Sequence, residues 1–286
     1  MDFGFLNSNS HYISDNIEIL PRQDIDRVIS EVRTNENMSD GWIYPPLIEA
    51  CKSKQESNTK KFKVFADCYT LPATHCINFH PYNPDKAKFL ILGVGFFFGV
   101  YLSPATHYKM WRVAYEEGKL TGVTPTHRDV ELALNYLARF YEDSSSRKRA
   151  GMFAAIHWFL VGQSQHYPWE RFEAQYKVLD GLCKLSAISQ CSHSRRPQEL
   201  SEKYHLQLPN WATWDKSGNA LSRLRNELTH EALYAGDAIG YAHPEENYDV
   251  EFSSFNTKLI AAILGIKSSY VHSSSQDRQY HVWDME

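Results

Sequence analysis

Apolar residues in the second half of the chain recur at helical spacing. In residues 169–188 the apolar side chains are three or four positions apart: Phe172, Tyr176, Leu179, Leu182 and Leu185. This spacing places them on one face of an α-helix. Residues 129–141, 148–162, 217–234 and 255–266 are similarly rich in apolar residues, and we expect a helix over each. A series of helices joined by short links is typical of a helical bundle.

The first half of the chain has a more mixed pattern. Residues 3–6 and 17–20 resemble short strands, and residues 62–69 alternate apolar and polar positions as a strand does. Residues 23–34 carry a helical stripe of Ile25, Val28, Ile29 and Val32. Pro21 stands two positions ahead of that stretch, and we expect it to mark the helix start.

Residues 89–102 are the most apolar stretch of the chain. The stretch is shorter than the ~20 residues that a membrane span needs, so we expect it inside the protein core. A strand, a pair of strands broken at glycine, and a buried helix all remain open. Residues 1–10 lack the basic start and apolar core of a signal peptide. We therefore expect a cytoplasmic protein that does not enter the membrane.

Together these patterns predict an α+β fold with two domains. Residues 1–125 form a mixed, partly β domain, and residues 126–286 form an all-α helical bundle. Residues 49–61 and 189–214 are polar, so we expect an exposed loop and an insertion there. The serine-rich tail from residue 267 is expected to fray or to dock weakly.

Composition limits how the protein can bind RNA. The chain is 43% apolar and 22% charged, which is typical of a folded protein, and its net charge is −4. No overall positive field attracts nucleic acid, so binding requires a local basic patch. Arg195, Arg196 and Arg223 are candidates for it, although a solvated loop explains the first two equally well. Trp211 and Trp214 fit base stacking or, more commonly, packing.

The five cysteines are scattered, which indicates buried thiols in a reducing compartment. Cys68, His75, Cys76 and His80 lie close enough in sequence to raise a metalloenzyme hypothesis. Their spacing is unlike that of common zinc sites, and we expect neither metal nor cofactor.

The hexapeptide 225–230 is the strongest candidate for chemistry. Leu221, Leu224 and Leu228 form an apolar seam, and at about 100° per residue Asn226 and His230 share another face. Arg225 lies one residue around from Asn226. A permanent cation, an amide and an imidazole suit RNA cleavage without metal. The alternative is structural: Arg225 pairs with Glu227 or Asp180, and His230 helps to end the helix.

A wider pattern surrounds this hexapeptide. The chain combines the basic and apolar stretch 147–160, the segments 169–172 and 176–182, and the Arg-Asn-x3-His core within 221–230. In this combination, residues 146–268 resemble the HEPN superfamily, and most closely its ApeA-like branch. Residues 255–266 fit the closing helix of those domains, whereas the long stretch between the third and fourth helices is a departure from the family.

The resemblance implies a function. HEPN domains are up-and-down helical bundles that pair, and catalytic members form a metal-independent endoribonuclease site across a homodimer. Many are toxins or effectors of antiviral, abortive-infection systems. The resemblance assigns the scissile phosphate to Arg225, general acid or base catalysis to His230, a positioning role to Asn226, and orientation of Arg225 to Asp180. A regulatory ligand or partner protein is then expected at the first domain. Other HEPN domains are non-catalytic scaffolds or antitoxin-like partners, which is the alternative function.

Overall fold

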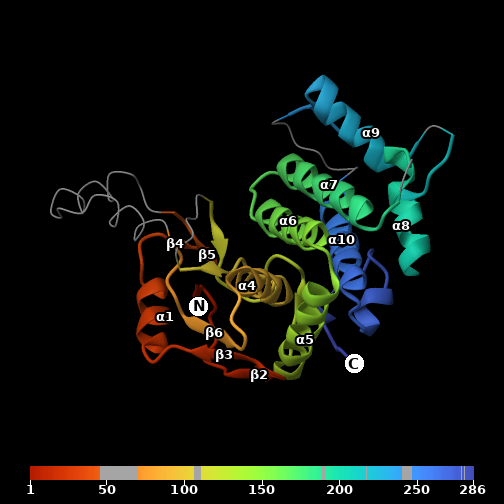
Figure 1. Ribbon diagram of the computed structural model, residues 1–286. Coiled ribbons are helices and arrows are strands. Elements are labelled where there is room, and N and C mark those ends of the chain that lie inside the picture. The colour runs from red at the N-terminus through yellow and green to blue at the C-terminus, as the bar shows by residue number, and fades with distance from the viewer. Residues whose placement is uncertain are drawn as a thin grey trace. The chain divides into compact units, whose positions relative to one another are not determined.

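The computed structural model describes residues 1–45, 70–105, 111–188, 191–216, 218–239, 247–277, 279 and 281–286. The fold is mixed α+β, as the sequence predicts. The chain divides into two compact units, Met1–Ala138 and Arg139–Glu286 (Figure 1). The division falls inside helix α5 (His127–Asp143), and the domain limits expected at residues 125 and 126 stay a prediction.

Most strands belong to the first unit. An antiparallel sheet has the order β2-β3-β6-β1-β7, and β4, β5 and β8 form a second one. The bounds are β1 (Asp2–Gly4), β2 (Tyr12–Ser14), β3 (Ile17–Pro21), β4 (Met38–Ser39), β5 (Trp42–Ile43), β6 (His75–Phe79), β7 (Ser103–Pro104), β8 (Val113–Ala114) and β9 (Val123–Thr124). Thus β3 confirms the strand at 17–20, and β1 confirms part of the strand at 3–6. The loop at 49–61 and the strand at 62–69 lie outside the described residues.

Helix α1 (Ile25–Arg33) buries Ile25, Val28 and Val32, which confirms the helical stripe. Its N-cap is Asp24, and Pro21 is the last residue of β3, so the expected role of Pro21 at the helix start is wrong.

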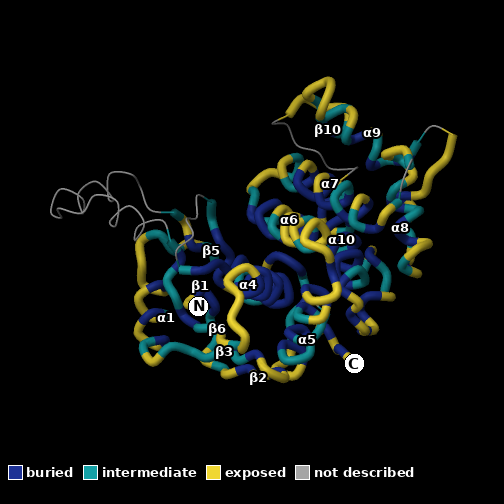
Figure 2. Tube along the Cα trace, in the orientation of Figure 1, coloured by how far each residue is buried: buried dark blue, intermediate teal, exposed yellow. Residues whose placement is uncertain are grey.

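Helix α4 (Pro84–Phe98) decides between the alternatives for residues 89–102: most of that stretch is a buried helix. The side chain of Asn83 caps its start by accepting hydrogen bonds from the next backbone N–H groups, and Gly99 ends it in the left-handed conformation. Figure 2 shows α4 as almost continuously buried.

The second unit is built around three helices, α6 (Ser146–Gln163), α7 (Pro168–Leu185) and α10 (Asp249–Leu264). The helices α6 and α7 pack along their length, and α10 packs on both (Figure 1). A Cβ atom built on Gly162 would lie 2.4 Å from the Cβ atom of Ala174, so the glycine permits this close packing. The helices expected at 129–141, 148–162 and 169–188 are therefore confirmed, and α10 begins earlier than the expected residue 255.

Two segments have more structure than their polar composition predicts. Residues 189–214 contain η1 (His193–Arg195), α8 (Arg196–Tyr204) and η2 (Asn210–Ala212), and they bury Leu200 and Trp211. The tail contains η4 (Ser269–His272) and β12 (His281–Val282). The expectation of a weakly docked tail is wrong, because Tyr270 and Trp283 are buried and their rings pack edge to face.

Candidate functional site

The hexapeptide lies at the end of a short helix, α9 (Ala220–Asn226), whose start is held firmly. The side chain of Asn219 accepts a hydrogen bond from the backbone N–H of Ser222 at 2.8 Å, and the Ser222 hydroxyl accepts one from Asn219 N at 3.1 Å. This is a capping box. Asn219 Nδ2 also donates to the carbonyl oxygens of Ser194 (2.6 Å) and Ala212 (3.1 Å). One buried amide therefore ties the helix to η1 and η2.

Beyond Asn226 the backbone leaves the α-helix. Residues Glu227–Glu231 form one π-helical turn, Ala232 is left-handed, and the hairpin β10 (Leu233–Tyr234) and β11 (Asp237–Ala238) follows. The single helix expected over 217–234 is therefore wrong. The apolar seam weakens along this segment, since Leu221 and Leu224 are buried but Leu228 only partly. A hydrogen bond of 3.0 Å from Gly236 N to Glu227 Oε2 ties the π turn to the hairpin.

The π turn changes which side chains meet. Residues five apart lie about 140° from each other around a regular α-helix, whereas π-helical hydrogen bonds join residues i and i+5. Arg225 Nη1 lies 3.4 Å from His230 Nε2 and 3.1 Å from Asn226 Oδ1. The structure thus brings all three side chains together, with Arg225 in the middle. This differs from the expected pairing of Asn226 and His230 on one α-helical face.

The hydrogen-bonding groups of Arg225 and His230 determine which side chain donates in their contact. A guanidinium has only donors, so His230 Nε2 accepts and carries a lone pair in this arrangement. Arg225 has no carboxylate partner among the described residues, so the proposed pairing with Glu227 or Asp180 is not what the structure contains. Arg225 is partly buried, whereas Asn226 and His230 are exposed. A polymer in solution can therefore reach the group.

Asp180 on α7 belongs to a second cluster. Its carboxylate forms a short ion pair with Arg196, and His193 Nδ1 lies 3.7 Å from it. Arg196 Nη1 also lies 2.8 Å from His193 Nδ1, and the imidazole nitrogen must accept there. Asp180 therefore orients Arg196, and not Arg225 as expected. The reason is that α8 and η1 bring their own cation and imidazole to this face of α7.

Tyr176 lies one turn before Asp180 on α7, in the apolar stripe that predicted this helix. Its ring stacks on His193 at 6.3 Å, and its buried hydroxyl has no hydrogen-bond partner among the described residues. Burial raises the pKa of Tyr176 to about 12; Asp180 adds to the rise, whereas Arg196 and Arg225 oppose it. A tyrosine in an apolar stripe gives no sign of this role, although its polar end needs a partner when buried.

Electrostatic influence links the two clusters. Partial burial lowers the pKa of His193, the positive charges of Arg196 and Arg225 lower it further, and Asp180 opposes them. Arg225 thus acts on His193 as well as contacting His230. Two arginines and two histidines share one neighbourhood in a single chain.

The other expected RNA contacts do not form one patch. The guanidinium of Arg195 lies over the exposed ring of Trp214 at 5.0 Å and 3.8 Å from Glu199, whereas Arg223 lies 4.0 Å from Glu227. Trp211 is buried and donates to Glu251, which agrees with packing. A pocket of about 530 Å³ opens beside Asn226. Among the described residues, Asp215, Glu227 and Glu231 line it together with a single cation, Arg223, so its net negative charge disfavours phosphate.

The geometry of the described residues does not support the zinc hypothesis. Cys68 lies outside the described residues, and His75 is buried, with Nδ1 3.0 Å from Thr74 Oγ1. Burial lowers the pKa of His75 to about 4. In the part of the chain that the structure describes, no three His, Cys, Asp or Glu side chains are grouped to hold a metal ion.

No protein-family model, curated protein or solved structure matches the chain. The likeness to the HEPN superfamily therefore rests on the residues of this chain alone. Within the described ranges, every helix is too short or too polar to traverse a bilayer.

Proposed function

We propose that the protein is a metal-independent endoribonuclease of the HEPN type. The observation that carries the proposal is the junction of α9 and the π turn, where the Arg225 guanidinium lies 3.4 Å from Nε2 of the exposed His230. It combines a phosphate-binding cation with an imidazole that can accept a proton. Cleavage of RNA by its own 2′-hydroxyl requires both groups.

The chemistry begins when RNA displaces the contact between Arg225 and His230. A distance of 3.4 Å makes this contact weak, and a phosphate offers the guanidinium two oxygens instead. His230 Nε2 is then free to accept the proton of the 2′-hydroxyl. The bond between O2′ and phosphorus forms, the bond from phosphorus to O5′ breaks, and O5′ takes up a proton. To Asn226 we assign the holding of the ribose or of the imidazole.

In an in-line attack, O5′ leaves on the side of phosphorus opposite O2′, so the His230 that takes the proton of the 2′-hydroxyl does not reach O5′, and a second group must act as the acid. The resemblance to HEPN domains favours a homodimer, in which the partner's copy of the same turn completes the site. The exposure of Asn226 and His230 supports such a meeting of two copies. We further propose that the protein is a cytoplasmic toxin or antiviral effector that cleaves cellular RNA. Its first domain, residues 1–125, binds the regulatory ligand or partner protein in this proposal.

The test uses the full chain and total RNA, with and without EDTA, followed by mapping of the cleaved ends. Arg225→Ala and His230→Ala should each lower the cleavage rate at least about 100-fold, because a group that stabilises transition-state charge and a general base each contribute about that much or more. Arg225→Lys should restore only part of the rate, since the charge returns without the planar fork. All three should keep the wild-type unfolding free energy within about 0.5 kcal/mol and the wild-type oligomeric state.

His166→Ala is the control, because His166 is an exposed histidine outside the site. It should cleave as the wild type does. Unchanged cleavage by the double variant of Arg225 and His230 would refute the site, and loss of cleavage in EDTA would refute metal independence. A wild-type protein that binds RNA without cutting it would favour the scaffold or antitoxin-like function.

A further inference from the structure

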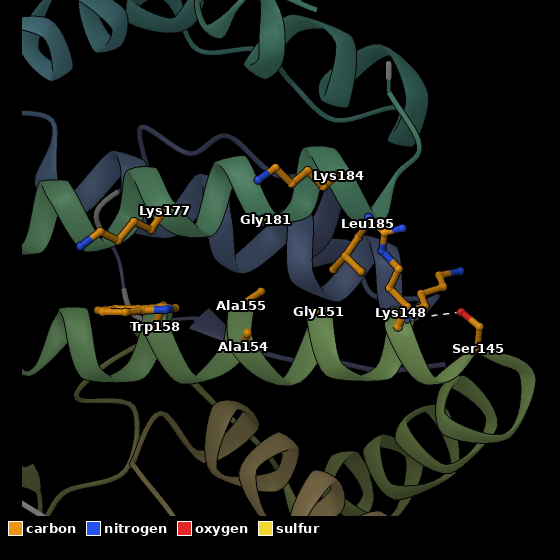
Figure 3. Close-up of a pocket in the computed structure, with 11 residues that line it drawn as sticks. Ser145, Lys148, Gly151, Ala154, Ala155, Trp158, Lys177, Gly181, Lys184 and Leu185 are labelled. Atoms are coloured by element: carbon orange, nitrogen blue, oxygen red, sulfur yellow. Dashed lines mark hydrogen bonds between the residues drawn. The ribbon is translucent and has the colours of Figure 1, made fainter. Parts of the chain in front are cut away.

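A groove of about 580 Å³ runs between α6 and α7 (Figure 3). Small residues form its floor, among them Gly151, Ala154 and Gly181. A Cβ atom built on Gly181 would meet nothing within 4 Å, so the space above this glycine is open. The volume is in the range of about 300–1,000 Å³ that is typical of small-ligand sites.

Positive charge surrounds this groove. Among the described residues that line it, the only charged side chains are Arg147, Lys148, Lys177 and Lys184. Such a concentration of cations stands out in a chain with a net charge of −4. Arg147 and Lys184 form no ion pair with any described residue. Ser145 caps α6 at one end of the groove, where the helix dipole adds partial positive charge. The groove therefore suits a ligand with several negative groups.

An aromatic platform adjoins these cations. Trp158 on α6 is 42% exposed, and Lys177 Nζ lies 4.7 Å from its ring centroid (Figure 3). Glu173 pairs with Lys177 at 2.8 Å from outside the groove. An exposed indole next to lysines is the combination with which proteins bind single-stranded nucleic acid: bases stack on the ring and phosphates meet the cations. The core of a protein–protein interface is, in contrast, depleted of charge.

Helix α7 forms one side of the groove and also carries Tyr176 and Asp180, and Tyr176 is close enough to the candidate site to feel the charge of Arg225. Lys177, Gly181 and Lys184 line the groove, and Tyr176 and Asp180 precede the first two by one residue, about 100° around the helix. An RNA strand in the groove would thus lie on the face of α7 next to the one that carries Tyr176 and Asp180, on a helix only about 10–12 Å wide.

We propose that the groove between α6 and α7 binds a single-stranded segment of the RNA substrate. One base takes the place of Lys177 over the Trp158 ring. The displaced Lys177 then holds an adjoining phosphate, as Arg147, Lys148 and Lys184 do. The choice of RNA as the ligand rests on the proposed function, whereas binding itself can be measured without cleavage.

The experiment uses the full chain with Arg225→Ala and His230→Ala as a non-cleaving parent, and follows the fluorescence anisotropy of a labelled single-stranded RNA at several salt concentrations. Adding Trp158→Ala should raise Kd about tenfold or more, and Trp158→Phe should recover most of the affinity. Adding Lys184→Gln should weaken binding and reduce the salt slope by about 0.7. The matched control is Lys267→Gln, which removes an exposed lysine that does not line the groove and should leave Kd unchanged.

Equal affinity of the parent and its Trp158 and Lys184 variants would overturn the groove assignment, as would equal binding of a duplex of the same sequence. The two proposals fail separately. If wild-type protein cuts RNA and Trp158→Ala changes neither cleavage nor binding, the groove proposal fails and the proposed function stands. If the parent binds through the groove but wild-type protein cuts nothing, the proposed function fails and the groove stands.

Discussion

Two regions of the second unit are stabilised in different ways: the pair of helices α6 and α7, and the segment 219–232. The two helices are 18 residues long each and bury residues such as Phe159 and Leu179 completely. Helix α9 has 7 residues, and a π turn with no buried residue follows it. Burial of apolar area stabilises the first region, and specific hydrogen bonds at Asn219 and Glu227 hold the second. The candidate site lies where few contacts contribute to stability, which leaves its polar groups exposed to solvent.

Matched leucines give the largest expected difference between the two regions. Leu179→Ala removes a side chain with no exposed surface and leaves a cavity, so it should lower the unfolding free energy by about 2–5 kcal/mol. Leu228→Ala on the π turn removes a partly buried side chain and should cost about 1 kcal/mol. Urea unfolding measures both, and similar losses would mean that the turn is as tightly packed as the bundle.

A buried lysine inside the bundle gives the next largest expected effect, which is a change of the unfolding free energy with pH. Lys258 on α10 is buried, and its Nζ donates to Ser273 O at 3.0 Å. Burial lowers the pKa of Lys258 to about 8, from an ordinary 10.5, although Asp277 opposes this. Between these values the unfolded chain still holds a proton that the folded chain has released, so raising the pH favours folding.

The unfolding free energy of the wild type should therefore rise, relative to Lys258→Met, by on the order of 3 kcal/mol between pH 8 and 10.5. Urea titrations of both proteins across this range check the difference. Parallel pH profiles would show that Lys258 keeps its proton in the folded protein.

Substitution by alanine of two glycines on the facing helices α6 and α7 gives the smallest expected changes in stability, and the two changes have opposite signs. Gly162→Ala places a methyl group against Ala174, which cannot move aside without its backbone, and should destabilise by about 1–3 kcal/mol. Gly181→Ala meets open space and should stabilise by up to about 1 kcal/mol, because alanine favours the helix. Thermal unfolding distinguishes them, and a gain in stability from Gly162→Ala would contradict the close packing.

Apolar periodicity predicted the bundle well for a physical reason: α6 and α7 bury one face each, and burial is recorded in the spacing of Phe159, Leu179 and Leu182. It predicted the site segment poorly. Leu221, Leu224 and Leu228 fit an uninterrupted α-helix equally well, and a change to π-helical hydrogen bonds leaves no mark on that spacing.

Contacts between side chains on different elements could not be predicted from the sequence either. Asp180 and Arg196 meet because α7 and α8 pack together, and His193 joins them from η1. The sequence placed Arg225, Asn226 and His230 in one segment, but only the fold adds Tyr176 and His193 to their surroundings. The burial of the tail was not predicted because its many serines indicated an exposed segment, whereas a few large aromatic side chains, such as Tyr270 and Trp283, pack into the core.

The π turn has a consequence for how this segment can vary. Contact between Arg225 and His230 depends on the number of residues in one turn more than on which residues fill it. The exposed positions of the turn other than His230 can change freely, whereas loss of a single residue would rewind the turn and rotate the two side chains apart. Over many generations, such a segment should drift in composition and stay constant in length.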